Sequence, residues 1–277
     1  MDAKRIKELK VTALKIRKSI VDSVHSAKAG HPGGSLSSAD LLTYLYFEKM
    51  NIDPKDPRKA DRDRFVLSKG HAAPVLYATL AHRGYFDVEE LLTLRKTTSR
   101  LQGHPDMKGI PGVDMSSGSL GQGISTACGM ALSAKHFGND FRVFTILGDG
   151  EIEEGQVWEA AMFAANKNLS NLVAFVDFNN LQIDGSIDEV NSAKPIDKKF
   201  EAFNWHVITI NGHDFQEIEA ALKEAETVDK PVCIVANTVK GKGVSFMENQ
   251  VSWHGSAPND EQYEQAMAEL KAQYAEI

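Results

Sequence analysis

The sequence has few cysteines, no long apolar run and no excess of positive charge. Among its 277 residues only two are cysteines, and Cys128 and Cys233 both stand in apolar surroundings, which predicts small core residues and a reducing compartment. No apolar run approaches the ~20 residues of a membrane helix, and the charged N-terminus is unlike a signal peptide. The net charge of −7 argues against nucleic acid as the main partner. We therefore expect a cytoplasmic protein that binds neither membranes nor nucleic acid.

What remains is the composition of an ordinary soluble domain, in which strands alternate with helices. Apolar residues at steps of three and four from Ile6 to Val24 predict a long first helix, ending in a loop at 30–34. Further helices are predicted over 39–48, 73–84, 124–136, 152–167, 197–203 and 214–226, and strands over 64–68, 142–148, 171–178, 205–210 and 231–238. This alternation indicates the α/β class, with a doubly wound, mostly parallel sheet and helices on both faces. We expect one domain over 1–277, with a C-terminal tail from about 241.

Polar residues follow two of the predicted strands, where parallel sheets bind their ligands. Gly148-Asp149-Gly150 ends the strand 142–148, and Asn179 ends the strand 171–178. Asp149, Asn179 and the backbone carbonyl of Leu181 are oxygen ligands suited to Mg²⁺, and the glycines would let a phosphate approach the start of helix 152–167. Gly-Asp-Gly alone could be a plain turn with a capping aspartate. The second strand end at this spacing favours a metal–diphosphate site.

Four histidines stand in loops rich in glycine and proline. They are His31 in Gly-His-Pro-Gly-Gly, His71 in Lys-Gly-His-Ala, His104 in Gly-His-Pro-Asp and His254 in Trp-His-Gly. Histidines so placed can donate to a developing alkoxide and shuttle protons near neutral pH. A zinc site is the alternative, which is disfavoured because no His/Cys pair shows ligand spacing.

These segments resemble, one by one, the diphosphate-binding domain of the transketolases, and the resemblance runs from the first helix to Trp-His-Gly. It implies thiamine diphosphate as cofactor, bound through Mg²⁺, with Ca²⁺ or Mn²⁺ able to substitute. It also implies that His71 and His254 contact the diphosphate, that His31 and His254 lie near the reacting carbon, and that His104 meets the hydroxyls of the donor sugar.

The resemblance assigns further cofactor contacts. Gly150 and Asn179 would lie at the diphosphate. The backbone of Gly118, Ser119 and Leu120 would meet the aminopyrimidine region of the cofactor; many relatives have proline where this chain has Ser119, which leaves those backbone contacts possible. Ile183 could wall the cofactor pocket or be a plain core residue.

Helix 152–167 is expected to have two roles. Its buried face is predicted to consist of Trp158, Ala161, Met162 and Ala165. By resemblance, Glu154 and Glu159 lie at a subunit interface; the alternative is a pair of solvated acids, favoured by the helix dipole at its first turns.

The resemblance covers only one domain of a full transketolase. Family members have a second domain, which binds the pyrimidine ring and supplies an activating glutamate, and the chain stops at Ile277 before it. We therefore expect the N-terminal subunit of a split transketolase, completed by a separate C-terminal chain in an α2β2 assembly. The implied reaction, typical of the pentose phosphate pathway, moves a two-carbon ketol unit from a ketose phosphate to an aldose phosphate. The alternatives are a non-catalytic thiamine-diphosphate-binding module, a 2-oxo-acid dehydrogenase subunit, a 1-deoxyxylulose-5-phosphate synthase, and a transketolase for unusual sugars.

Overall fold

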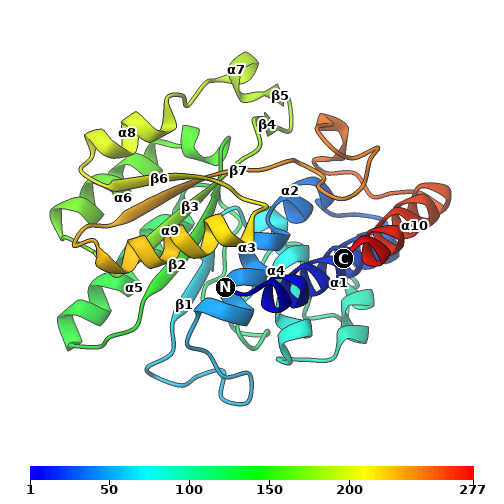
Figure 1. Ribbon diagram of the computed structural model, residues 1–277, viewed down its shortest axis with the longest axis horizontal. Coiled ribbons are helices and arrows are strands. Elements are labelled where there is room, and N and C mark those ends of the chain that lie inside the picture. The colour runs from blue at the N-terminus through cyan, green and yellow to red at the C-terminus, as the bar shows by residue number, and fades with distance from the viewer.

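A five-stranded parallel sheet in the order β1-β2-β3-β7-β6 forms the centre of the molecule (Figure 1). The computed structural model describes the backbone of residues 1–277 and every side chain except that of Glu276. The sheet strands are β1 (Arg64–Leu67), β2 (Val143–Gly148), β3 (Leu172–Phe178), β6 (His206–Asn211) and β7 (Val232–Asn237). The α/β class and the doubly wound parallel sheet are confirmed, and all five predicted strands are present.

Helices cover both faces of the sheet because its strands are apolar on both sides. In β2, Phe144 and Ile146 pack into one core, whereas Val143 and Leu147 pack into the other. The first core is covered by α1 (Ala3–Ala27), α3 (Ala39–Tyr44), α4 (Ala73–Arg83), α9 (Phe215–Thr227) and α10 (Asp260–Glu276). The second is covered by α5 (Gln122–Phe137), α6 (Gly155–Asn166) and α8 (Ile196–Ala202). Both cysteines are buried in the second core, as expected.

Short elements complete the chain. They are α2 (Pro32–Ser37), α7 (Ile187–Val190), the hairpin β4 (Leu181–Gln182) and β5 (Gly185–Ser186), a π-helical turn at Leu45–Lys49, and 3-10 turns at Gly70–Ala72, Val88–Thr93, Glu151–Glu153 and Val251–Trp253. The segment from about 96 to 118 is irregular. None of the helices among the described residues is long and apolar enough to cross a membrane.

The loop predicted at 30–34 is wrong from Pro32 onward, because α2 begins there. Proline suits the first position of a helix, where its missing N–H is not needed. Gly33 is required for close packing: a Cβ there would lie 2.8 Å from the carbonyl oxygen of Trp253. The glycines therefore mark a tightly packed short helix.

The buried face predicted for helix 152–167 is right at Ala161 and wrong at Met162, while Trp158 and Ala165 pack partly buried against the core. The helix α6 begins at Gly155, and its buried residues are Val157, Ala160, Ala161 and Ala164. Met162 is 51% exposed. Apolar residues occur on almost every side of this helix, so the periodicity did not single out the core face.

The segment after 241 ends in α10, which lies beside α1 (Figure 1). Ala266 and Leu270 of α10 are buried in the same core as the inner face of α1. The hydroxyl of Tyr263 donates to Asp22 Oδ1 at 2.8 Å. The C-terminal segment is thus packed against the first helix.

Candidate functional site

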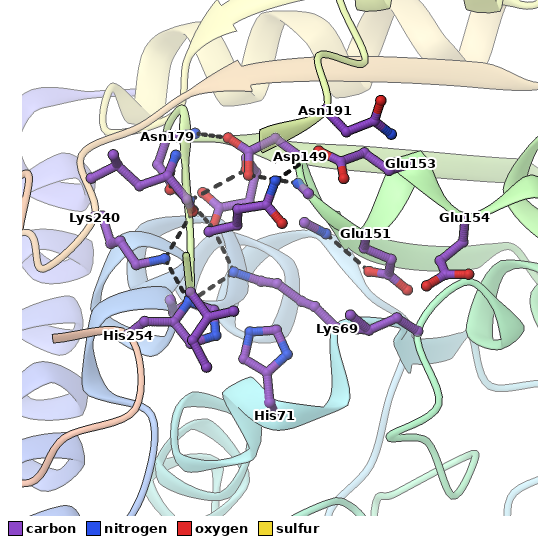
Figure 2. A pocket seen from close by; sticks show the side chains of 18 residues that line it. Lys69, His71, Asp149, Glu151, Glu153, Glu154, Asn179, Asn191, Lys240 and His254 are labelled. Atoms are coloured by element: carbon purple, nitrogen blue, oxygen red, sulfur yellow. Dashed lines mark hydrogen bonds and ion pairs between the residues drawn. The ribbon is translucent and has the colours of Figure 1, made fainter. Parts of the chain in front are cut away.

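A cavity of about 390 Å³ lies at the carboxyl ends of the central strands (Figure 2). The strand register brings these ends together, because Gly148 at the end of β2 pairs with Asp177 of β3 and Phe178 of β3 pairs with Asn237 of β7. The volume is within the range of about 300–1,000 Å³ that small-molecule and cofactor sites occupy. The carboxyl ends of the strands, where the sequence predicts a ligand site, therefore border a cavity.

Asp149 joins the ends of β2 and β3. It is 2% exposed, and its Oδ1 accepts the Gly150 N–H at 2.9 Å. Its Oδ2 accepts the Asn179 N–H at 2.9 Å and the Asn180 N–H at 2.5 Å. Burial and the neighbouring Asp177 raise the pKa of Asp149 to about 6, against the opposing effect of Lys240. The structure thus brings Asp149 and Asn179 together, as the spacing predicted.

The oxygen atoms at this edge suit a hard cation. Besides the Asp149 carboxylate, the site holds the Asn179 Oδ1, which accepts the Leu181 N–H at 3.2 Å, and the Leu181 carbonyl. The Leu181 carbonyl accepts a hydrogen bond from Lys240 Nζ at 2.9 Å. Amide and carbonyl oxygens each have two lone pairs, so both retain one for a cation. One carboxylate with two neutral oxygens is ligand chemistry that fits Mg²⁺.

The helix start expected directly after Gly150 is not there. A 3-10 turn, Glu151–Glu153, follows Gly150, and α6 begins only at Gly155. The Gly150 N–H already donates to Asp149. The Gly150 N–H is therefore not free for a phosphate, the approach of a phosphate to this terminus stays a prediction, and positive charge at the cavity comes from elsewhere.

Two buried lysines supply that charge, and no motif in the sequence predicts a role for them. Lys69 and Lys240 are each 2% exposed and both line the cavity. Lys69 Nζ donates to the Gly34 carbonyl at 2.8 Å and to Asp177 at 2.5 Å. Burial lowers the pKa of Lys240 to about 8, against the opposing charge of Asp149. Lys69 follows shortly after β1 and Lys240 shortly after β7, as Asp149 follows β2. This position at a strand end is the feature of the sequence that indicates a place at the site.

Three of the four predicted histidines form a cluster beside the lysines. The ring centroids of His31, His71 and His254 lie 5.2, 5.6 and 5.1 Å apart in the three pairs. His254 Nδ1 lies 3.0 Å from Lys240 Nζ, and Figure 2 shows His71 and His254 facing the cavity. The described residues contain no group of three or more His, Cys, Asp or Glu side chains arranged to hold a metal.

Burial keeps these rings neutral near pH 7. Burial, with the nearby charges of Arg95, His104 and Lys240, lowers the pKa of His31 to about 4. Burial and Lys240 lower the pKa of His254 to about 3, and burial and Lys69 lower that of His71. A neutral imidazole has one donor and one acceptor nitrogen, which proton transfer requires.

His104 lies next to the cavity but does not line it. Its ring packs on Gly118, where a Cβ would come within 3.0 Å of its Cδ2. Tyr77 Oη fixes the segment, lying 2.9 Å from the carbonyl oxygens of both Gln102 and His104. Burial and Arg95 lower the pKa of His104. Of the 118–120 segment only Leu120 lines the cavity, while Ser119 lines a separate hollow.

The other predicted residues lie around the rim. Ile183 lines the cavity and is 60% exposed, so the plain-core alternative is wrong. Glu154 also lines the cavity, and both Glu154 and Glu159 are exposed. Glu151, for which the sequence predicts no role, is buried and accepts hydrogen bonds from Ser68 Oγ at 2.5 Å and from two backbone N–H groups. It fixes the turn that carries Asp149.

Residues 8–275 match the family described as "Transketolase, thiamine diphosphate binding domain". This chain belongs to the transketolase family. The resemblance drawn from the sequence is thereby confirmed, as is a domain that binds thiamine diphosphate.

Relatives of two lengths share this transketolase domain. The chain is 47% identical to "6-deoxy-6-sulfo-D-fructose transketolase subunit SqwG" of a Clostridium strain, covering 94% of this chain and 95% of that protein. It is 41% identical to one of the subunits of the apulose-4-phosphate transketolase of Phocaeicola vulgatus, covering 96% of this chain and 95% of that protein. It is 42% identical to human transketolase, but it spans only 43% of that protein.

A solved structure agrees with this relationship. The transketolase of Pichia stipitis, in complex with sedoheptulose 7-phosphate, superposes with a TM-score of 0.90 at 33% identity. The superposition covers 98% of this chain and 44% of the other. The chain therefore shares the fold of this part of transketolase over nearly its whole length.

Proposed function

We propose that this chain is the N-terminal, cofactor-binding subunit of a transketolase that a separate chain completes. The observation that carries the proposal is the meeting of Asp149, Asn179 and two buried lysines beside a cluster of neutral histidines. Two relatives of matching length are named as transketolase subunits, which supports a two-chain enzyme.

In this proposal the chain holds the cofactor by its diphosphate end. Asp149, the Asn179 Oδ1 and the Leu181 carbonyl bind Mg²⁺, for which Ca²⁺ or Mn²⁺ can substitute. The positive charges of Lys69 and Lys240 offset the negative charge of the diphosphate, and His71 donates to it. Gly150 and the backbone of 118–120 line the rest of the cofactor site. A buried, preorganised set of donors of this kind binds an anion with little reorganisation.

The reaction transfers a two-carbon ketol unit from a ketose phosphate to an aldose phosphate. Thiamine diphosphate supplies the electron sink for that unit. His31 and His254 hold and move protons at the donor carbonyl oxygen, and His104 binds the donor hydroxyls. Since their pKa values are lowered, His31 and His254 are neutral at pH 7 and can both donate and accept.

A second chain supplies what this one lacks in the proposal. It carries the pyrimidine-binding domain and the activating glutamate, and the assembly is α2β2 in the cytoplasm. The exposed Glu154 and Glu159 lie at the interface between subunits. We propose 1–277 as a single diphosphate-binding domain, the C-terminal segment from about 241 included.

One observation favours a second candidate donor. The 47% identity to the subunit named for 6-deoxy-6-sulfo-D-fructose extends over 263 residues. A ketose that carries a sulfonate in place of a phosphate is therefore the alternative donor for this transketolase.

A native pull-down tests the proposal. The tagged chain is purified from its own cells with Mg²⁺ and thiamine diphosphate, and the eluate is assayed for ketol transfer from xylulose 5-phosphate or 6-deoxy-6-sulfo-D-fructose to an aldose phosphate. A stoichiometric partner together with activity on either donor is expected. The matched control is the Asp149→Asn chain, which should capture the partner without activity. A partner that produces 2-oxo-acid decarboxylation instead would overturn the transketolase assignment.

A further inference from the structure

Asp177 is a charged residue within an apolar strand, and it receives hydrogen bonds from four parts of the chain. It is fully buried near the end of β3. Its Oδ2 accepts from Ser37 Oγ at 2.6 Å, Lys69 Nζ at 2.5 Å and Asn179 Nδ2 at 3.2 Å, and its Oδ1 accepts from Thr238 Oγ1. The proposed cation ligands do not include it.

The chemistry of this carboxylate fixes the orientation of the Asn179 amide. An ionised carboxylate only accepts hydrogen bonds, and the ammonium of Lys69 beside it keeps it ionised. Asn179 must therefore turn its Nδ2 toward Asp177. Its Oδ1 then points away from Asp177, toward the side where Leu181 donates to it. Two backbone contacts favour the same orientation, namely the Leu181 N–H that donates to Oδ1 at 3.2 Å and the Asp177 carbonyl that accepts from Nδ2 at 3.5 Å. The carboxylate adds to them the one contact that involves a charge, which makes it the stronger kind of hydrogen bond.

We propose that Asp177 is a positioning residue, which sets the affinity for the cation by holding the Asn179 amide with its oxygen toward the metal. The inference rests on the proposed function, because it requires Asn179 to be a cation ligand. A flipped amide would present N–H groups to the cation, so the site would lose one ligand. Partners behind metal ligands typically change metal affinity by about 10–100-fold.

The same contacts explain the place of the buried ion pair. Lys69 donates to Asp177 and to the Gly34 carbonyl of α2, so one carboxylate anchors both the ligand-bearing strand end and the helix that follows His31. A buried ion pair adds little net stability by itself, since desolvation offsets the attraction. Since stability does not account for the Lys69–Asp177 pair, orientation of the Asn179 amide is the role that we assign to it.

The test measures Mn²⁺ binding by electron paramagnetic resonance on the full chain, in the presence of thiamine diphosphate. Asp177→Leu removes the acceptor and should weaken Mn²⁺ binding by about 10–100-fold. Asp177→Asn keeps an oxygen at the Oδ2 position and should weaken it by less than about tenfold. Adding Asn179→Asp to Asp177→Leu should recover most of the affinity, because a carboxylate presents oxygen in both orientations. Thr238→Val is the matched control, as it removes a donor to the other oxygen, and it should bind Mn²⁺ as the unaltered chain does.

The results of these Mn²⁺ measurements distinguish a failure of the positioning role from a failure of the proposed cation site. Unchanged Mn²⁺ affinity in Asp177→Leu, or an equal loss in Asp177→Asn, would overturn the positioning role while leaving the cofactor site in place. Should Asp177→Leu not fold, Asp177→Asn still decides: a loss of Mn²⁺ affinity of about tenfold or more in that variant overturns the inference. No Mn²⁺ binding by the unaltered chain would overturn the cation site itself and the inference with it.

Discussion

Replacing His254 with asparagine should make the free energy of unfolding less dependent on pH. His254 is half-buried, and its Nδ1 lies 3.0 Å from Lys240 Nζ. Asparagine places an oxygen near the Nδ1 position, so it can still accept from Lys240 but cannot be protonated in this range. The change therefore removes one titrating group and keeps its main contact.

The sign follows from where the proton binds. The pKa of His254 lies at about 3, whereas a histidine in an unfolded chain has a pKa of about 6.5. Between these values the unfolded chain binds a proton that the folded chain does not, so stability falls as the pH is lowered. At about pH 5, some 1.5 pH units below the unfolded pKa, the loss is about 2 kcal/mol at ~1.36 kcal/mol per unit. Solvent screening at this half-buried ring reduces it to about 1–2 kcal/mol.

Urea titrations of the isolated chain, followed by circular dichroism at about pH 7.5 and about pH 5, measure the effect. The unaltered chain should lose about 1–2 kcal/mol more than His254→Asn between the two conditions. His206→Asn serves as the control, because His206 lies on the surface and pairs with Glu224. An identical pH dependence in the unaltered chain and His254→Asn would refute the claim that the cluster excludes the proton.

Three further predictions concern the site and the packing around it. Asp149→Asn should abolish Mg²⁺-dependent thiamine diphosphate binding, measured by isothermal titration calorimetry; unchanged affinity would remove Asp149 from the metal site. His31→Ala should leave that binding largely intact but lower the turnover of the assembled enzyme, so a pure binding defect would contradict its place at the reacting carbon. In α5, Gly123→Ala should destabilise the chain by about 1–3 kcal/mol in urea, because its Cβ would lie 2.5 Å from Ser68 Oγ. Gly129→Ala, with nothing within 4 Å of its Cβ, should instead stabilise it by up to about 1 kcal/mol; equal effects would show that the close approach does not matter.

The position of the proposed metal site, at the carboxyl ends of β2 and β3, could be predicted because strand ends are easy to locate in a sequence. The apolar runs before Asp149 and Asn179 are buried strands, and neighbouring parallel strands bring their ends together. Lys69 and Lys240 could not be given a role in the same way, because a lysine after a strand is usually solvated. Only the folded chain shows that burial among partners from other elements turns them inward.

Local patterns failed where more than one structure satisfied them. Glycine next to proline predicts a loop, but Gly33 serves a close contact with the Trp253 carbonyl inside a short helix. The apolar positions of α6 fit two helical faces, and contact with the sheet selects the one containing Val157. In the sequence Asp177 is only a break in an apolar strand, because its partners Ser37, Lys69 and Thr238 come from segments far apart in sequence.

The hydrogen bonds of Glu151 bear on the entropy of ligand binding. Its buried carboxylate accepts from Ser68 Oγ, from the Gly121 N–H at 3.0 Å and from the Gly148 N–H at 3.0 Å. Three loops that would otherwise move separately are thus held as one unit before any ligand arrives. Ordering a loop residue costs about 1–2 kcal/mol of conformational entropy. In these loops that cost is incurred on folding, so more of the contact energy with a ligand remains available as affinity.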